Sequence, residues 1–315
     1  MSILEIKNLN LGFNTECGFR QALWDVSFSL NKGEIHALVG ESGCGKTISA
    51  MSALRLLPKN AVITSGEILF KGEDILKFDN RQMSSLRGAK IALIPQDPMT
   101  SLNPLYTVGN QLLEVIKKHQ GLSGDAAYKK AVEALKIVQI PSAEERFNSY
   151  PHEFSGGMKQ RAIIAMALAC NAEILIADEP TTALDVTIQA QIMKLLSEIK
   201  NRTSAAILLI THDLALVAEN ADYVSVMYAG RIAESAPSEE FFANPKHPYS
   251  RALLNAIPSA RTQKLETIQG QPPSIYQDIS GCRFHPRCDF CMEKCTTEIP
   301  PLFDKGKNHL SACWL

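Results

Sequence analysis

The sequence predicts an α/β fold with a largely parallel sheet, a smaller antiparallel sheet, a helical insertion and a small cysteine-rich C-terminal extension. Three observations support this prediction. Short apolar runs alternate with helical patterns, two early segments alternate apolar and polar residues, and Pro, Gly and Cys become frequent after about residue 245. At 315 residues the chain is long enough for one full α/β domain and a smaller appendage.

The antiparallel strands are predicted from their alternation. Residues 3–6 (ILEI) and 23–30 (LWDVSFSL) place apolar side chains at every second position, as strands with one buried face do. The sequence NKG then forms a turn into IHALVG at 35–40, a short apolar run that indicates a buried strand.

Further short apolar runs predict the parallel sheet. Buried strands are expected at 91–95, 174–178, 206–211 and 223–230, and helices at 46–57, 187–200 and 213–220. Strands that alternate with helices favour a parallel sheet covered on both faces.

Residues 97–172 differ from the rest because helical patterns dominate them. We expect a helical subdomain inserted between two strands of the sheet. After about residue 245 the periodicity fades. We therefore predict one domain at 1–245 and a C-terminal extension at 246–315.

Composition lowers the expectation for several classes of partner and compartment. A net charge of −1 gives no basic field for nucleic acid or an anionic bilayer. No apolar run approaches the ~18 residues that span a bilayer, and the N-terminus lacks the pattern of an export signal. We expect a cytoplasmic protein, in which eight cysteines are thiols or metal ligands rather than disulfides.

The strongest motif is GESGCGKT at 40–47, which matches the phosphate-binding P-loop between a predicted strand and a predicted helix. Its backbone N–H groups are expected to hold phosphate oxygens, Lys46 to place a positive charge at the β and γ phosphates, and Thr47 to ligate Mg²⁺. The residues predicted to surround the phosphates are Gly40, Ser42, Gly43, Cys44, Gly45, Lys46 and Thr47.

A second motif, ILIADEP at 174–180, delivers two carboxylates to the carboxyl end of a strand, where open α/β sheets bind ligands. Asp178 is predicted to hold Mg²⁺. Glu179 is predicted to orient or deprotonate the attacking water in phosphoryl transfer.

A third motif, FSGGMKQR at 154–161, resembles the signature motif of ATP-binding cassette (ABC) ATPases, which have the P-loop NTPase fold. It has Phe154 where Leu is usual and Met158 where Gln is usual. Other motifs resemble the family in order: IPQDP at 94–98, TTALD at 181–185 and ITHDL at 210–214. The resemblance covers roughly residues 1–245.

This resemblance implies ATP and Mg²⁺ as ligands and assigns further roles. Gln96 would act in catalysis and at Mg²⁺, and His212 would act in catalysis as the switch histidine. The residues implied to contact the nucleotide across a subunit interface are Ser155, Gly156, Gly157 and Asp185. For the adenine base, the family stacks an aromatic residue. Phe13 is the favoured candidate, with Phe19 as a competitor and core packing as an alternative for either.

The resemblance also implies partners. Each ATP in this family lies between two subunits, so a second ATPase subunit is expected. PQDPMTSLNP, HPYSRALL and GCRFHPRC resemble the ATPases of bacterial dipeptide and oligopeptide importers, with nickel importers as a related alternative. This implies a heterodimeric translocase with two membrane permeases and, indirectly, an external solute-binding protein, peripheral on the cytoplasmic side of the inner membrane. The other open alternatives are a non-transport ABC ATPase and a zinc module that binds nucleic acid.

Five of the eight cysteines fall in the last 34 residues. They could be bystander thiols or zinc ligands, since Cys₄ sites commonly hold zinc. The resemblance to peptide-importer ATPases implies a [4Fe–4S] cluster held by Cys282, Cys288, Cys295 and Cys313, with Cys291 as an extra thiol.

Overall fold

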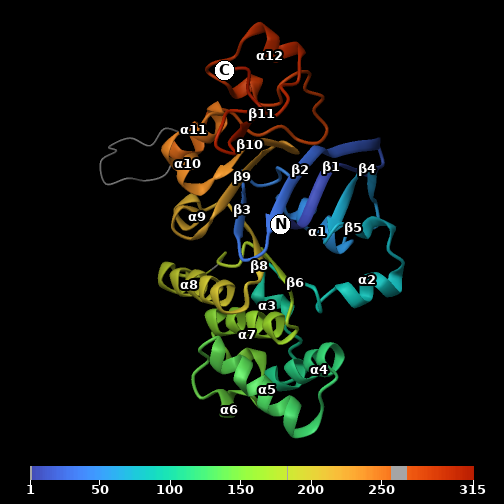
Figure 1. Cartoon of the computed structure of the whole chain (residues 1–315), viewed down its shortest axis with the longest axis vertical. Coiled ribbons are helices and arrows are strands. Elements are labelled where there is room, and N and C mark those ends of the chain that lie inside the picture. The colour runs from blue at the N-terminus through green and yellow to red at the C-terminus, as the bar shows by residue number, and fades with distance from the viewer. Residues whose placement is uncertain (1, 183, 257–267) are drawn as a thin grey trace. The chain divides into compact units, whose positions relative to one another are not determined.

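The structure is a computed structural model that describes residues 2–182, 184–256 and 268–315. These residues form two compact units, one made of Met1–Lys77 with Ile210–Leu315 and the other of Phe78–Leu209 (Figure 1). The predicted boundary at residue 245 stays a prediction.

The first unit contains an antiparallel sheet in the order β2-β1-β4-β5. Its strands are β1 (Ser2–Thr15), β2 (Gly18–Asn31), β4 (Ala61–Phe70) and β5 (Glu73–Asp74). The predicted pairing of the first two strands is confirmed, but both are longer than predicted. The added residues mix buried, half-buried and exposed side chains without a strict alternation, and backbone pairing extends the strands through them. β4 was not predicted, because exposed, half-buried and buried residues follow one another in it without a regular alternation.

The second sheet of this unit begins with β3 (Ile35–Val39), which pairs in parallel with β9 (Tyr223–Tyr228). β10 (Arg231–Pro237) then pairs antiparallel with β9, and two short C-terminal strands, β12 (Leu310–Ser311) and β11 (Phe303–Asp304), follow. The C-terminal extension from residue 246 onward, called the tail below, therefore adds strands to this sheet. β10 escaped prediction because RIAESAP carries polar residues at buried positions.

Short helices accompany these strands. They are η1 (Ile75–Lys77), α1 (Lys46–Leu54), α9 (Leu214–Asn220), α10 (Ser238–Ala243), α11 (Pro248–Asn255), η3 (His285–Arg287) and α12 (Glu293–Thr297). α1 ends before the predicted residue 57, since Arg55 adopts a left-handed conformation with φ of 50° and caps the helix.

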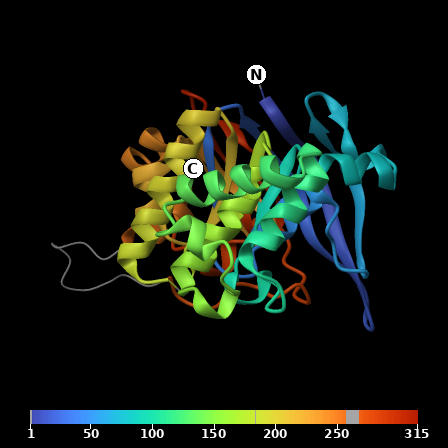
Figure 2. The ribbon, with the colours of Figure 1, turned by 90° about the horizontal axis from the view of Figure 1, so that it is seen from below.

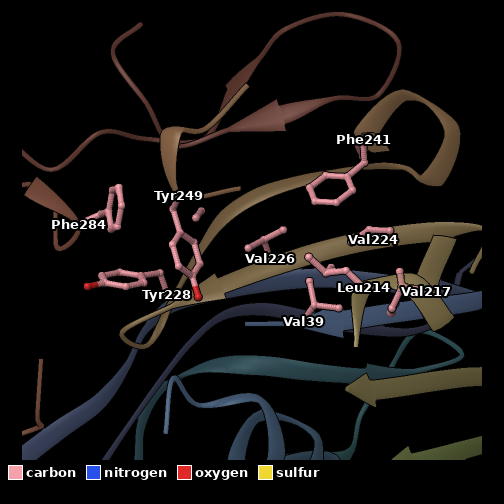
Figure 3. Packing of buried hydrophobic residues seen from close by; sticks show 12 residues of the cluster. Val39, Leu214, Val217, Val224, Val226, Tyr228, Phe241, Tyr249 and Phe284 are labelled. Atoms are coloured by element: carbon pink, nitrogen blue, oxygen red, sulfur yellow. The ribbon is translucent and has the colours of Figure 1, made fainter. Parts of the chain in front are cut away.

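The core of the first unit joins strand residues to the tail. Figure 3 shows the rings of Tyr228, Tyr249 and Phe284 grouped together, with Val39, Val224 and Val226 to one side of them. Tyr228 meets Tyr249 and Phe284 edge-on, with ring centroids 4.7 and 5.1 Å apart. Edge-to-face pairs of this kind add to the apolar area they bury, so the tail packs as part of the core.

The second unit pairs β6 (Ile91–Ile94) in parallel with β7 (Ile174–Asp178), and β8 (Ala206–Thr211) follows β7 in the sheet order. No strand interrupts residues 95–173, all of which the structure describes. Helices fill this span: α3 (Pro98–Ser101), α4 (Val108–Gln120), α5 (Gly124–Ile137), α6 (Ala143–Arg146), η2 (Pro151–Glu153) and α7 (Gly156–Ala169). α2 (Asn80–Leu86) and α8 (Val186–Thr203) complete the unit.

Helix α5 packs against both α4 and α7 (Figure 2). Its buried positions Ala127, Ala131 and Leu135 repeat every four residues and face these neighbours. Whether this group is a separate subdomain stays a prediction. Over the described part of the chain, none of the helices has the length and apolar character needed to span a bilayer.

A buried carboxylate connects the C-terminal strands to the rest of the first unit. Glu234 of β10 is fully buried and accepts hydrogen bonds from the backbone N–H groups of Lys246 (2.6 Å) and His247 (2.9 Å). His309, also buried, lies 2.5 Å from the same carboxylate through Nε2. A buried carboxylate is tolerated only when such partners surround it, so this network holds β10, the segment before α11 and the tail in one arrangement.

Replacement of His309 by Ala is expected to lower the free energy of unfolding by about 2–4 kcal/mol, because it leaves a buried carboxylate short of a partner. The matched control in the same segment is Lys307→Ala, which breaks an exposed ion pair with Glu240 and should change stability little. Urea denaturation followed by circular dichroism measures both. Equal stabilities for the two variants would contradict the role given to Glu234.

Candidate functional site

Residues 40–47 connect the end of β3 to the start of α1, as the motif requires. Gly40 has φ of 148°, and a Cβ there would lie 2.2 Å from the carbonyl oxygen of Met227, so only glycine fits. Gly43 also has positive φ (78°), but no atom lies within 4 Å of its missing Cβ. The loop is thus packed at its first glycine and open at its middle, where a ligand can approach the backbone.

The ammonium group of Lys46 folds back over this loop. Its Nζ donates to the carbonyl oxygens of Gly40 (2.7 Å) and Glu41 (3.0 Å), and the residue is only 5% exposed. Cys44 lies beside it, and burial raises the pKa of this thiol, so it stays neutral. The lysine is therefore the cation of the loop, held at the N-terminus of α1, where the helix dipole also favours anions.

Residues distant in sequence also hold the loop. Gly230 donates its N–H to the carbonyl of Cys44 (2.8 Å). The N–H of Glu41 donates to the Tyr249 hydroxyl (3.0 Å), and Arg287 forms a bidentate ion pair with the Glu41 carboxylate. Tyr249 and Arg287 lie 208 and 246 residues from Glu41, so no local pattern could have identified them.

These features fit a phosphate ligand with Mg²⁺. The loop offers a helix N-terminus, a buried ammonium group and an open glycine backbone, which together suit phosphate oxygens. Thr47 is exposed at the start of α1, and its hydroxyl is of the type that ligates Mg²⁺ in a P-loop.

In the second unit, β7 ends at Asp178, which is 3% exposed, and Glu179 follows in a left-handed conformation with φ of 45°. Such a backbone is uncommon for a residue with a side chain. The Glu179 carboxylate accepts from Gln96 Nε2 and from the Thr182 hydroxyl, both at 2.9 Å. The structure therefore brings together two predicted residues, Gln96 and Glu179, and adds Thr182, which sequence reasoning missed.

The SGG sequence lies at the start of α7. The Ser155 hydroxyl accepts from the N–H of Met158 (3.3 Å) as a helix cap, and Ser155 is exposed. A Cβ on Gly157 would lie 2.8 Å from Ile188, so α7 and α8 approach closely there, whereas Gly156 has more room. Phe154, one of the departures from the family motif, is buried and contributes to packing.

The remaining predicted residues lie at three other places. Asp185 caps α8 through the N–H of Ile188 (2.9 Å) and is exposed. His212 follows β8 and is also exposed. Phe13 is half-buried in β1, while Phe19 on β2 is 43% exposed and covers Gly12. The choice between these two aromatic residues stays a prediction.

Four of the tail cysteines line the same cavity, but their thiols are not placed as a set of metal ligands. Cys282, Cys288, Cys295 and Cys313 all line a cavity of about 10 Å³, while Cys291 is exposed. Burial raises the pKa of Cys282 and Cys313, and that of Cys288 to about 11. Across the described residues, no group of three or more His, Cys, Asp or Glu side chains is placed to hold a metal ion. The predicted iron–sulfur site is thus not supported by this geometry, although its four thiols converge.

Comparison with known proteins gives the following matches. Residues 23–182 match the family described as ABC transporter, and residues 233–295 match the oligopeptide/dipeptide transporter C-terminal region. A probable peptide ABC transporter ATP-binding protein of Sinorhizobium fredii is 49% identical over 99% of this chain and 94% of its own length. The dipeptide transport ATP-binding protein of Bacillus subtilis is 47% identical over the same shares.

Solved structures give a consistent fold. An ATP-binding cassette solved as a dimer in a post-hydrolysis state with ADP and phosphate is 27% identical, with a TM-score of 0.67 over 75% of this chain and 98% of that one. A cassette of Clostridium perfringens, part of an ABC transporter complex, is 30% identical, with the same TM-score over 77% and 91% of the two chains.

Proposed function

The chain belongs to the ABC transporter ATP-binding proteins, and we propose that it is the ATP-hydrolysing subunit that powers import of dipeptides or oligopeptides. The relatives named above are named as peptide transport proteins, and the matches extend over nearly the whole chain. A nickel substrate is therefore not favoured. The same match argues against a non-transport ABC ATPase and against a zinc module for nucleic acid.

Within this function, each residue has a chemical task. Lys46 and the loop amides neutralise the phosphates, and Thr47 with Asp178 would hold Mg²⁺, which supplies charge neutralisation at the transferred group. Glu179 accepts the proton of the attacking water, Gln96 orients that water, and His212 stabilises the transferred phosphate. Phe13 stacks on the adenine base.

The observation that carries this assignment is the fixed position of Glu179. Its backbone has a left-handed conformation, and Gln96 and Thr182 both donate to one carboxylate oxygen, Oε2. We assign this oriented carboxylate to the attacking water, because a carboxylate accepts hydrogen bonds from water and can take up its proton.

We predict that Glu179→Gln keeps ATP binding but lowers turnover by at least about a hundredfold, since an amide cannot accept a proton from water. Lys46, Thr47 and Asp178 are untouched and still hold the nucleotide. The measurement is ATP affinity and steady-state hydrolysis by the purified transporter complex. Hydrolysis within a few-fold of wild type would remove Glu179 from this role.

The ATP site is completed by a second subunit. The chain has one P-loop and one SGG sequence, so Ser155, Gly156, Gly157 and Asp185 are assigned to the nucleotide on the partner. Ser155 and Asp185 are exposed and stand at the N-termini of α7 and α8, positions that suit an anion. We assign the partner as a different but homologous ATPase, so that the pair is a heterodimer.

We predict that the isolated chain hydrolyses ATP slowly and that activity per chain rises when the partner ATPase and permeases are added. A site divided between subunits loses activity on dilution, because dissociation separates its halves. A concentration series of hydrolysis rates tests this prediction. High activity that is independent of dilution would mean that one chain holds a complete site.

The membrane partners follow from the family. Permease subunits carry the substrate across the bilayer, and this chain binds to them from the cytoplasmic side of the inner membrane, with an external solute-binding protein delivering the peptide. ATP closes the two ATPase subunits and hydrolysis reopens them, and this two-state motion is what the permeases convert into transport.

For the tail we propose a [4Fe–4S] cluster on Cys282, Cys288, Cys295 and Cys313, with zinc as the alternative metal and Cys291 as a spare thiol. The support is that these four thiols, and not Cys291, line one cavity. The cluster would stabilise the loop-rich tail and take no part in hydrolysis.

Protein purified without oxygen is expected to be brown, to absorb near ~400 nm as thiolate-bound iron–sulfur centres do, and to contain matching iron and sulfide. Cys288→Ser should lose the colour, whereas Cys291→Ser should keep it. Colourless protein with stoichiometric zinc would favour the alternative, and protein with neither metal would make the thiols bystanders.

A further inference from the structure

The tail forms an ion pair with the phosphate-binding loop through Arg287. Arg287 ends the short helix η3, and its guanidinium group meets Glu41, the second residue of the loop. Nη1 lies 2.6 Å from one carboxylate oxygen and Nη2 lies 3.0 Å from the other, a bidentate geometry that fixes both groups. The Arg287 side chain is 6% exposed and that of Glu41 is 25% exposed, so water reaches this ion pair mainly from the Glu41 side.

The remaining donors of Arg287 are also engaged. Nε donates to the carbonyl of Gln269 (2.9 Å), Nη2 to that of Gly270 (3.3 Å), and Nη1 to the Tyr228 hydroxyl (3.3 Å). The hydrogen bonds to Glu41 raise the pKa of Arg287 above its already high value, so the charge is permanent. Arg287 thus has a fixed position before any nucleotide arrives.

Glu41 poses a difficulty for an anion site. Its carboxylate belongs to the same loop that must receive phosphate, and like charges repel through a poorly screened environment. Its carbonyl accepts from Lys46 Nζ and its N–H donates to Tyr249, so its backbone has little freedom to move the charge away. Arg287 neutralises that charge where it stands.

We propose that Arg287 is a positioning residue for nucleotide binding: it cancels the charge of Glu41 and holds the start of the P-loop in its binding conformation. The C-terminal tail is then part of the ATP site. This inference rests on the proposed use of residues 40–47 as the nucleotide site and goes beyond it, because it assigns a task in ATP binding to a residue of the tail.

The first test is binding of a fluorescent ATP analogue with Mg²⁺ to the purified full chain. Arg287→Ala is expected to raise Kd about five- to tenfold, because it exposes an unpaired carboxylate to the phosphates. The matched control is Arg283→Ala, four residues earlier in the same tail, where the guanidinium stacks on Trp24. Its Kd should stay within about twofold of wild type.

A second measurement separates charge from folding. In a Glu41→Gln chain there is no charge to cancel, so adding Arg287→Ala should cost much less than it does in wild type. The double variant should bind ATP more tightly than Arg287→Ala alone. Arg287→Lys keeps the positive charge but lacks the planar guanidinium group that binds both carboxylate oxygens, so its Kd should lie between those of wild type and Arg287→Ala. If the alanine variant does not fold, Arg287→Lys is used for the test.

In the assembled transporter, Arg287→Ala should raise the KM for ATP by a similar factor while kcat at saturating ATP stays within about twofold. A Kd within twofold of wild type, an equal loss in the Glu41→Gln background, or a parallel fall of kcat and thermal stability would overturn the proposal. Lys46→Ala distinguishes failure of this proposal from failure of the proposed nucleotide site. If Lys46→Ala binds ATP with the wild-type Kd, residues 40–47 are not the nucleotide site.

Discussion

The phosphate-binding loop depends on hydrogen bonds and an ion pair from residues that lie far from it in the sequence. A P-loop offers its backbone N–H groups to an anion, so its carbonyls and its own carboxylate need partners elsewhere. Here Gly230 supplies a donor to Cys44, and Arg287 supplies the cation for Glu41. These supports come from the β9–β10 turn and from the tail, and they explain why a short motif needs a much longer chain to hold it.

The tail can serve this purpose because it is anchored to a packed core. Tyr249 and Phe284 stack edge-on with Tyr228 at the end of β9, and the same Tyr249 carries the hydroxyl that accepts from Glu41 (Figure 3). Glu234 then joins β10 to the C-terminal strands through buried hydrogen bonds. An ion pair at Arg287 would be of little use on a mobile segment, since ordering that segment would cancel the gain.

Much of this was predictable from sequence, and the reasons are physical. Buried strands such as β7 are apolar up to their last residue, here Asp178, and the P-loop spacing follows from the geometry of phosphate binding, so both leave strong local signals. β10 was missed because its buried Glu234 looks like a surface residue until its partners are known. The contacts of Tyr249 and Arg287 with Glu41 were not predicted, because these residues lie far from the loop in the sequence and meet it only in the folded chain. The iron–sulfur site, by contrast, was implied by the resemblance to peptide-importer ATPases, and in the described residues its four cysteines line one cavity without forming a ligand geometry.

Glu41 and Glu179 show how different surroundings fix identical side chains in different ways. Glu41 faces a guanidinium group that binds both of its oxygens, so it is held as a neutral ion pair and contributes structure. The Glu179 carboxylate accepts hydrogen bonds from the Gln96 amide and the Thr182 hydroxyl, which orient it at the end of β7. The ion pair with Arg287 therefore accounts for a structural part of Glu41 in the loop, whereas the contacts of Glu179 fit a carboxylate that is oriented for the chemistry proposed for it.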